Sequence, residues 1–128
     1  MAKVLVKQMD FNWNGITYEY NELRRDVDCY RGEDLARIIL NNKDRLKTVA
    51  SMVMGGKLSD ILEDAYRLTN NIDSPWMGGE VLEIGTVSED AKGRSTSIGD
   101  VVVVEGVEYM VDSFGFTCLD DIELEEVA

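Results

Sequence analysis

The chain has 128 residues, of which 45% are hydrophobic and 30% charged, and this suits a single globular domain that buries a core without metals or disulfides. No stretch approaches the roughly 18 to 20 apolar residues of a membrane span, and the first residues lack a secretory signal, so we expect a soluble, cytoplasmic protein. The formal net charge of -12 repels nucleic-acid phosphates, which disfavours direct DNA or RNA binding and favours basic partners.

The N-terminal segment has the pattern of a β-hairpin. Aromatic and aliphatic residues alternate with polar ones over residues 3–20, on both sides of Asn14-Gly15. Asn-Gly favours a two-residue type I′ turn, because both turn positions need positive φ. The following run from Asn21 to Arg31 mixes charges without periodicity, and it reads as a connection that could hold a short turn of helix.

Helical spacing begins at Glu33. Apolar residues three and four positions apart form one stripe as far as Val53, which predicts an amphipathic helix that Gly55-Gly56 ends. A second helix is predicted to follow, with Ser59 or Asp60 as its N-cap and with Asn70-Asn71 and Pro75 at its end. Its predicted buried stripe is Leu58, Ile61, Leu62, Ala65 and Leu68. The short Gly-Gly link makes the two helices a helical hairpin.

The second half of the chain has the pattern of strands. Val101–Val104 and Val107–Val111 flank Glu105-Gly106, which predicts a tight hairpin, and residues 88–99 form a polar loop. Two further strands are predicted, at Val81–Val87 and Phe114–Leu119. The sum is a single α+β domain, residues 1–128, whose mostly antiparallel sheet has an N-terminal hairpin, a central helical hairpin and a C-terminal strand meander. Residues 120–128 form an acidic tail whose flexibility the sequence leaves open.

The residues offer little catalytic chemistry. The chain has no histidine, which removes Ser-His-Asp and Cys-His arrangements and the commonest metal ligand, and no glycine-rich nucleotide loop is present. Cys29 and Cys118 lack a C-x-x-C spacing and are expected to be buried free thiols. Acidic groups such as Asp26 with Asp28, or Asp120 with Asp121, are expected to be solvated rather than to bind metal. We therefore predict no enzyme activity, no metal site and no cofactor.

The negative charge is concentrated in the second half. Residues 1–50 carry nine Lys or Arg against eight Asp or Glu, whereas residues 51–128 carry four against seventeen. The acidity either forms a binding surface for a basic partner or only keeps the protein soluble. On the first alternative, ten carboxylates are the predicted contact residues: Glu80, Glu83, Glu89, Asp90, Asp100, Glu105, Glu108, Asp112, Asp120 and Asp121.

Two local motifs have both a functional and a structural interpretation. The arginine and three hydroxyls of Arg94, Ser95, Thr96 and Ser97 either bind an anion or receive phosphate, or they form a turn whose hydroxyls bond their own backbone. Phe114-Gly115-Phe116 is either an exposed aromatic contact or a pair of core residues around a bulge. The structural interpretation is the more common one for both motifs.

A resemblance to a known family lies in the same region. Ser97-Ile-Gly-Asp-Val-Val-Val103 and Tyr109-Met-Val-Asp-Ser-Phe-Gly-Phe116 resemble the YodL-like module of mobile-element and phage proteins, over about residues 94–119. The run Tyr66–Trp76, taken with Arg94–Ser97, is also similar to small uncharacterised proteins of tailed bacteriophages. The resemblance implies an accessory protein in the cytoplasm of an infected bacterium. It brings no catalytic residues, and in some proteins the module is joined to antirestriction domains.

Two hypotheses about function follow. The first is a phage protein that binds and modulates a host protein with a basic surface, such as a nucleic-acid-binding protein, by mimicking DNA charge or by antagonising host defence. The second is a phage structural or assembly protein without inhibitory activity, for which self-association or a virion partner is expected. Neither involves a membrane or direct contact with nucleic acid.

Overall fold

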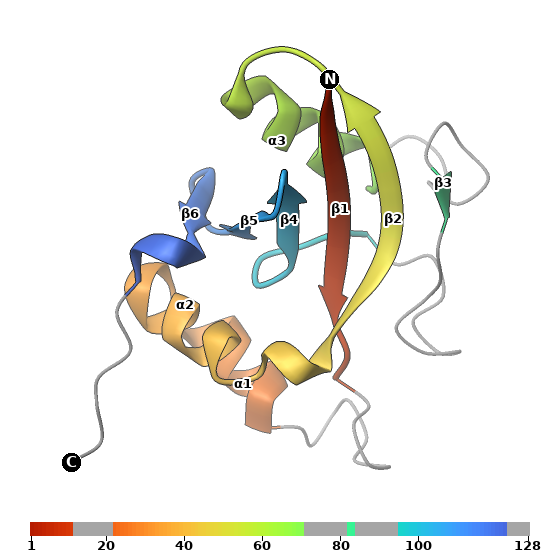
Figure 1. Ribbon diagram of the computed structural model, residues 1–128. Helices are drawn as coiled ribbons and strands as arrows, with labels where there is room; N and C mark the ends of the chain where they lie inside the picture. Colours follow the sequence, from red (N-terminus) through yellow and green to blue (C-terminus); the bar gives the residue numbers. More distant parts are fainter. Residues whose placement is uncertain (12–21, 71–81, 84–94, 123–128) are drawn as a thin grey trace.

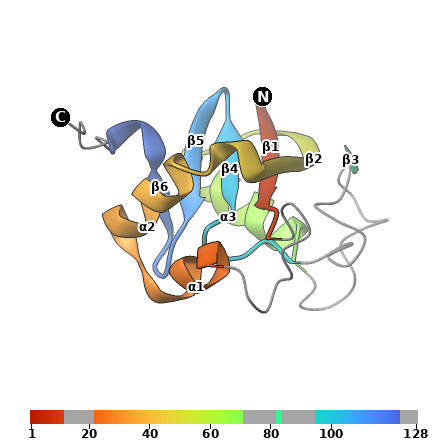
Figure 2. The same ribbon diagram turned by 90° about the horizontal axis from the view of Figure 1, so that it is seen from below.

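The computed structural model describes residues 1–11, 22–70, 82–83 and 95–122 (Figures 1 and 2). Within them, six strands form one antiparallel sheet in the order β3-β2-β1-β4-β5-β6, which confirms the α+β class. The strands are β1 (Ala2–Met9), β2 (Leu46–Met54), β3 (Leu82–Glu83), β4 (Val101–Val104), β5 (Val107–Val111) and β6 (Phe116–Cys118). The helices are α1 (Glu22–Cys29), α2 (Gly32–Leu40) and α3 (Leu58–Leu68), with 3-10 turns η3 (Lys43–Arg45) and η4 (Leu119–Asp121).

Strand β1 forms the centre of the sheet. It pairs with β2 along its whole length and with β4 over Val4–Lys7. The predicted N-terminal strand is therefore confirmed, and its neighbours are strands that come later in the chain. The predicted turn at Asn14-Gly15 and its return arm lie outside the described residues.

The predicted helical hairpin is wrong in its first arm. Helix α2 ends at Leu40, and residues 46–54 form strand β2 rather than the second half of a helix. Asn42 ends the helix because its side-chain amide donates a hydrogen bond to the carbonyl of Ile38, at 2.8 Å. The β-branched Thr48, Val49 and Val53 then favour an extended chain.

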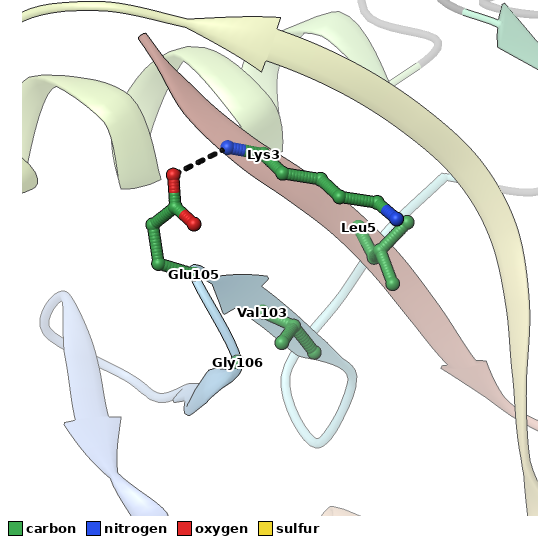
Figure 3. A pocket seen from close by; sticks show the side chains of 5 residues that line it. All are labelled: Lys3, Leu5, Val103, Glu105 and Gly106. Atoms are coloured by element: carbon green, nitrogen blue, oxygen red, sulfur yellow. Dashed lines mark hydrogen bonds between the residues drawn. The ribbon is translucent and has the colours of Figure 1, made fainter.

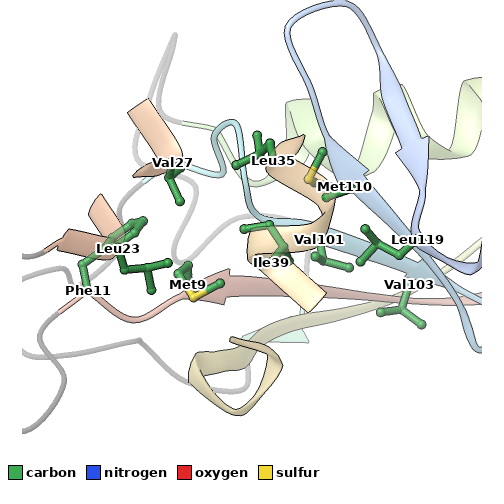
Figure 4. Packing of buried hydrophobic residues seen from close by; sticks show 11 residues of the cluster. Met9, Phe11, Leu23, Val27, Leu35, Ile39, Val101, Val103, Met110 and Leu119 are labelled. Carbon is green, nitrogen blue, oxygen red and sulfur yellow. The ribbon is translucent and has the colours of Figure 1, made fainter. Parts of the chain in front are cut away.

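The sheet carries one apolar cluster on each face. Helix α3 covers one face, and α1 with α2 covers part of the other (Figure 1). The α3 cluster comprises Val4, Val6, Val49, Ala50, Ile61, Leu62, Ala65, Val102 and Val104. The cluster under α1 and α2 comprises Met9, Phe11, Leu23, Val27, Leu35, Ala36, Ile39, Val101, Val103, Met110 and Leu119 (Figure 4).

The helices match the predictions unevenly. The second predicted helix is confirmed as α3, and Ile61, Leu62 and Ala65 of its stripe are buried, whereas Leu58 is 44% exposed, so its prediction as a buried residue is wrong. Its N-cap position is Lys57, without a side-chain capping bond, so the predicted cap at Ser59 or Asp60 is wrong. Helix α1 occupies eight residues of the segment 21–31, where a connection with at most a short turn of helix was expected. Among the described residues, no helix is long and apolar enough to cross a membrane.

The C-terminal meander is confirmed over β4 and β5. Glu105 and Gly106 between them have φ of 49° and 82°, as a type I′ turn requires. Strand β6 begins at Phe116 rather than Phe114, because the amide of Asp112 bonds the carbonyl of Gly115 and closes a turn before it. Strand β3 is the described part of the predicted strand 81–87. Residues 84–94 and 123–128, which include most of the predicted polar loop and tail, lie outside the described residues.

The expectation of buried thiols is wrong. Cys29 is exposed and Cys118 is half-buried, and both are free thiols. Cys29 is the last residue of α1, and its position places the side chain outside the apolar stripe made by Leu23 and Val27.

Candidate functional site

Two of the ten predicted contact carboxylates are mostly buried and form hydrogen bonds or ion pairs within the protein. Asp100 is 1% exposed and accepts hydrogen bonds from the amides of Met9 (2.9 Å) and Ser97 (2.8 Å). Its prediction as a contact residue is wrong, because its carboxylate joins β1 to the chain before β4. Glu108 has 15% of its side chain exposed and pairs with Lys43 at 2.6 Å, so it ties β5 to η3.

Of the other eight predicted carboxylates, four have side chains that the structure describes. Glu105 is exposed at the β4–β5 turn and accepts a hydrogen bond from the amide of Lys3 at 3.0 Å. Asp112, Asp120 and Asp121 are exposed or half-exposed after β5 and β6. Glu83 lies in β3, and nothing about its side chain is described. Glu80, Glu89 and Asp90 lie outside the described residues, as does Arg94 of the predicted anion-binding loop.

The described hydroxyls of that loop are engaged by the protein itself. Thr96 is buried, donates its hydroxyl to Thr69 Oγ1 at 2.8 Å and accepts a hydrogen bond from the Gln8 amide at 3.3 Å. Ser97 donates its amide to Asp100, and Ser95 is half-buried. The structural interpretation therefore holds for Thr96, whose hydroxyl is not available to an external anion.

Asp112 holds the β5–β6 turn against the start of α2. Its carboxylate accepts hydrogen bonds from the amides of Gly32 (3.3 Å) and Ser113 (2.8 Å) and from the hydroxyl of Thr117 (2.7 Å). Gly32 is the first residue of α2, so this carboxylate caps a helix that lies eighty residues away in sequence. Burial raises the pKa of Asp112, but the three hydrogen bonds and the charge of Arg31 outweigh it, and the pKa is lowered below its usual value.

Five carboxylates gather along one edge of the molecule. Leu119 of η4 packs in the same cluster as Leu35 of α2, and both views show η4 beside α2 (Figures 1 and 2). We call the resulting surface the acidic edge and define it as Glu33, Asp34, Asp112, Asp120 and Asp121. Arg37 pairs with both Glu33 and Asp34, and Arg31 interacts with Asp112, so negative charge exceeds positive charge there.

Two carboxylates of this edge affect the pKa of a tyrosine on the neighbouring strand. Burial raises the pKa of Tyr109 on β5, and nearby acidic groups, among them Asp120 and Asp121, raise it further. The sequence identified three of the five carboxylates from the excess of acids in the second half. It missed Glu33 and Asp34, because they belong to the nearly neutral first half and only the tertiary fold, through the hydrogen bond from Gly32 to Asp112 and the shared apolar cluster, brings them to this edge.

An exposed aromatic side chain lies beside the acidic edge. Phe114 is 99% exposed at the β5–β6 turn, whereas Phe116 is half-buried and packs against the α3 cluster. Only Phe116 therefore fits the structural interpretation of this motif. Gly115 has φ of 83°, a conformation that favours glycine and lets the turn close behind Phe114.

A shallow pocket of about 210 Å³ lies at the other end of β5. Leu5 of β1 and Val103 of β4 are direct partners in the sheet and provide its apolar floor. Lys3, Glu105 and Gly106 complete the lining (Figure 3). The pocket thus combines an apolar floor with one cation and one anion at its rim.

No group of three His, Cys, Asp or Glu side chains that could hold a metal ion occurs among the described residues. No protein-family model, curated protein or solved structure matches this chain.

Proposed function

We propose that this protein is a small acidic accessory protein of a bacteriophage that binds a basic surface of a host protein and modulates it. The acidic edge is the observation that supports binding, because it has five carboxylates from three separate segments, of which Glu33, Asp34 and Asp112 interact with two arginines. Such a surface attracts a partner rich in Lys and Arg and orients its approach. The phage setting, and with it the cytoplasm of an infected bacterium, rests on the sequence likeness of residues 97–116.

The partner that best fits this surface is a host nucleic-acid-binding protein. DNA presents about one negative charge per 1.7 Å of its axis, and proteins that bind it offer a complementary basic surface. Carboxylates along an edge compete for that surface by mimicking the charge of DNA. Antagonism of a host-defence protein is one biological form of this competition. The proposal involves no cofactor, no catalysis, no membrane and no direct nucleic-acid contact.

A second candidate is a phage structural or assembly protein. The observation that favours it is Phe114, which is 99% exposed and offers a large apolar contact. On this alternative the acidic residues keep the protein soluble, and salt has little effect on its association.

A pull-down at two salt concentrations separates the two candidates. Tagged protein is exposed to a nuclease-treated lysate of a bacterial host and washed at about 0.1 M or about 1 M salt, where the Debye length falls from about 10 to 3 Å. The double variant D120N/D121N removes two charges of the acidic edge. The matched control D60N/E63Q removes two exposed carboxylates of α3, on the other side of the sheet.

The binding proposal expects one dominant basic protein that is released at high salt, lost with D120N/D121N and retained with D60N/E63Q. Equal capture by all three proteins at both salt concentrations contradicts it. Recovery of only the protein itself, or of virion proteins from an infected lysate, supports the assembly alternative.

A further inference from the structure

The aromatic side chain at one end of β5 and the pocket at the other end have complementary chemistry. Phe114 is 99% exposed on a turn that the Asp112 carboxylate and the Asp112–Gly115 backbone bond (2.9 Å) hold in place. An aromatic ring of this kind buries about 150–250 Å² when it is covered. Because the turn is held in position by hydrogen bonds, little conformational entropy is lost when Phe114 docks.

The pocket offers a small apolar floor against which part of such a ring can pack. Leu5 and Val103 lie side by side on β1 and β4, and the stem of Lys3 extends alongside them (Figure 3). Val53 of β2 is the direct sheet partner of Lys3 and is 63% exposed, so the apolar surface continues beyond the pocket.

The charges beside the ring and at the pocket are also complementary. Asp112 lies two residues before Phe114 and interacts with Arg31, and Lys3 and Glu105 line the pocket. One nitrogen of the Arg31 guanidinium donates to the carbonyls of Val27 (2.7 Å) and Tyr30 (2.6 Å), while the group as a whole offers five N–H donors. Docking can therefore place Arg31 near Glu105, and Asp112 near Lys3.

The ring cannot enter the pocket of its own molecule. The Glu105-Gly106 turn precedes β5 and the Asp112–Gly115 turn follows it, so five residues of extended chain, about 17 Å, separate the two features. The contact must join two copies, and the pair then keeps one unused pocket, on the copy that gave its ring, and one unused ring, on the copy that gave its pocket. Such a head-to-tail contact extends into longer assemblies as concentration rises.

We propose that this protein self-associates head to tail, with Phe114 of one copy seated in the pocket formed by Lys3, Leu5, Val103, Glu105 and Gly106 of the next. The occupant of the pocket is a second copy of this chain. This contact does not depend on the acidic edge binding a basic partner, and it is measured on the purified protein alone.

Sedimentation velocity over a range of concentrations tests the proposal. Wild type is expected to gain mass as concentration rises, whereas F114S, which lacks the ring, and L5K, which places a charge in the pocket floor, are each expected to remain monomeric. Leu58→Ser is the matched control, because Leu58 is another exposed apolar residue, 44% exposed on α3, and its loss should leave the association unchanged. Circular dichroism establishes that each variant is folded.

Mixing the two defective variants gives the decisive result. F114S keeps an intact pocket and L5K keeps an intact ring, so an equimolar mixture should form a dimer of one copy of each and grow no further. If L5K does not fold, E105R replaces it by placing a cation opposite Arg31, and R31E/E105R should restore association. Wild type that stays monomeric at all concentrations, F114S that associates like wild type, or a mixture that stays monomeric overturns the proposal.

Discussion

Replacing Asp112 tests whether one carboxylate joins the β5–β6 turn to helix α2. The side chain accepts three hydrogen bonds, of which the one from Gly32 caps α2. A hydrogen bond to a charged group contributes about 1.5–3 kcal/mol, and loss of a helix N-cap costs about 0.5–2 kcal/mol. Asp112 is half-exposed, so water replaces part of this loss. We expect D112A to lower the free energy of unfolding by about 2–3 kcal/mol and D112N by about 1 kcal/mol.

The pH dependence of the Asp112 effect supplies a second readout. The folded-state pKa of Asp112 is lowered relative to the unfolded value of about 3.9, so its charge stabilises the fold fully above that value. This contribution is lost as pH falls through the folded-state pKa. The difference in unfolding free energy between wild type and D112N should therefore shrink below about pH 4.

Urea unfolding at a series of pH values measures both effects, with E63Q as the control. Glu63 is an exposed carboxylate on α3, and its replacement should change the unfolding free energy by less than about 0.5 kcal/mol. The capping role of Asp112 is refuted if D112A is as stable as E63Q, or if the difference between wild type and D112N is the same at low and neutral pH.

Three further predictions concern the interior and the thiols. G99A should destabilise the protein more than G56A in urea unfolding. Both glycines have positive φ, but a Cβ added at Gly99 would lie 2.8 Å from Val27, whereas a Cβ added at Gly56 would have no atom within 4 Å. Equal losses of stability in the two variants would contradict this. T96V should cost about 1–3 kcal/mol, because it removes the two buried hydrogen bonds that the Thr96 hydroxyl makes with Gln8 and Thr69, whereas the exposed S113A should be nearly neutral. A thiol reagent should modify the exposed Cys29 faster than the half-buried Cys118, with C29S and C118S assigning the phases, and equal rates would refute the difference in exposure.

The success of the sequence predictions depended on how many structures each pattern allowed. Four consecutive valines at 101–104, followed by Glu-Gly and a second valine-rich run, fit a strand hairpin far better than a helix, and both strands and their turn were predicted correctly. The run 46–54 has apolar residues at Leu46, Val49, Ala50 and Val53, which fit a helical period as well as a buried strand. Pairing with β1 makes this run a strand rather than a helix, and a pairing with a distant strand cannot be recognised from the sequence of residues 46–54.

The candidate site was predictable only in part for the same reason. The excess of acids in the second half identified Asp112, Asp120 and Asp121, because it can be counted from the sequence without knowing which residues lie nearby. Their grouping with Glu33 and Asp34 depends on tertiary structure, because α2 and η4 contribute to one apolar cluster although more than eighty residues separate Leu35 from Leu119. Phe-Gly-Phe fits either a buried or an exposed pair, because glycine allows the turn that separates Phe114 from Phe116.

Several acids of the second half have partners in the first half. Residues 95–122 contain six acids and no Lys or Arg, and four of those acids accept hydrogen bonds or ion pairs from residues of the first half. The four pairs, written donor first, are Met9 with Asp100, Lys3 with Glu105, Lys43 with Glu108 and Gly32 with Asp112. Three of these carboxylates thus accept a hydrogen bond from a backbone amide of the first half, and the fourth pairs with a lysine.

This division separates structural carboxylates from candidate binding carboxylates. Asp100 and Glu108 are committed to internal contacts, so replacing them should change stability first and binding only as a consequence. Asp112 belongs to the acidic edge and also holds internal contacts, so replacing it changes stability and surface charge together. Asp120 and Asp121 are exposed, and η4 presents them beside α2. Because their neutralisation disturbs little of the fold, a loss of partner binding in D120N/D121N would report on recognition itself. The net charge of -12 alone could not have made that distinction.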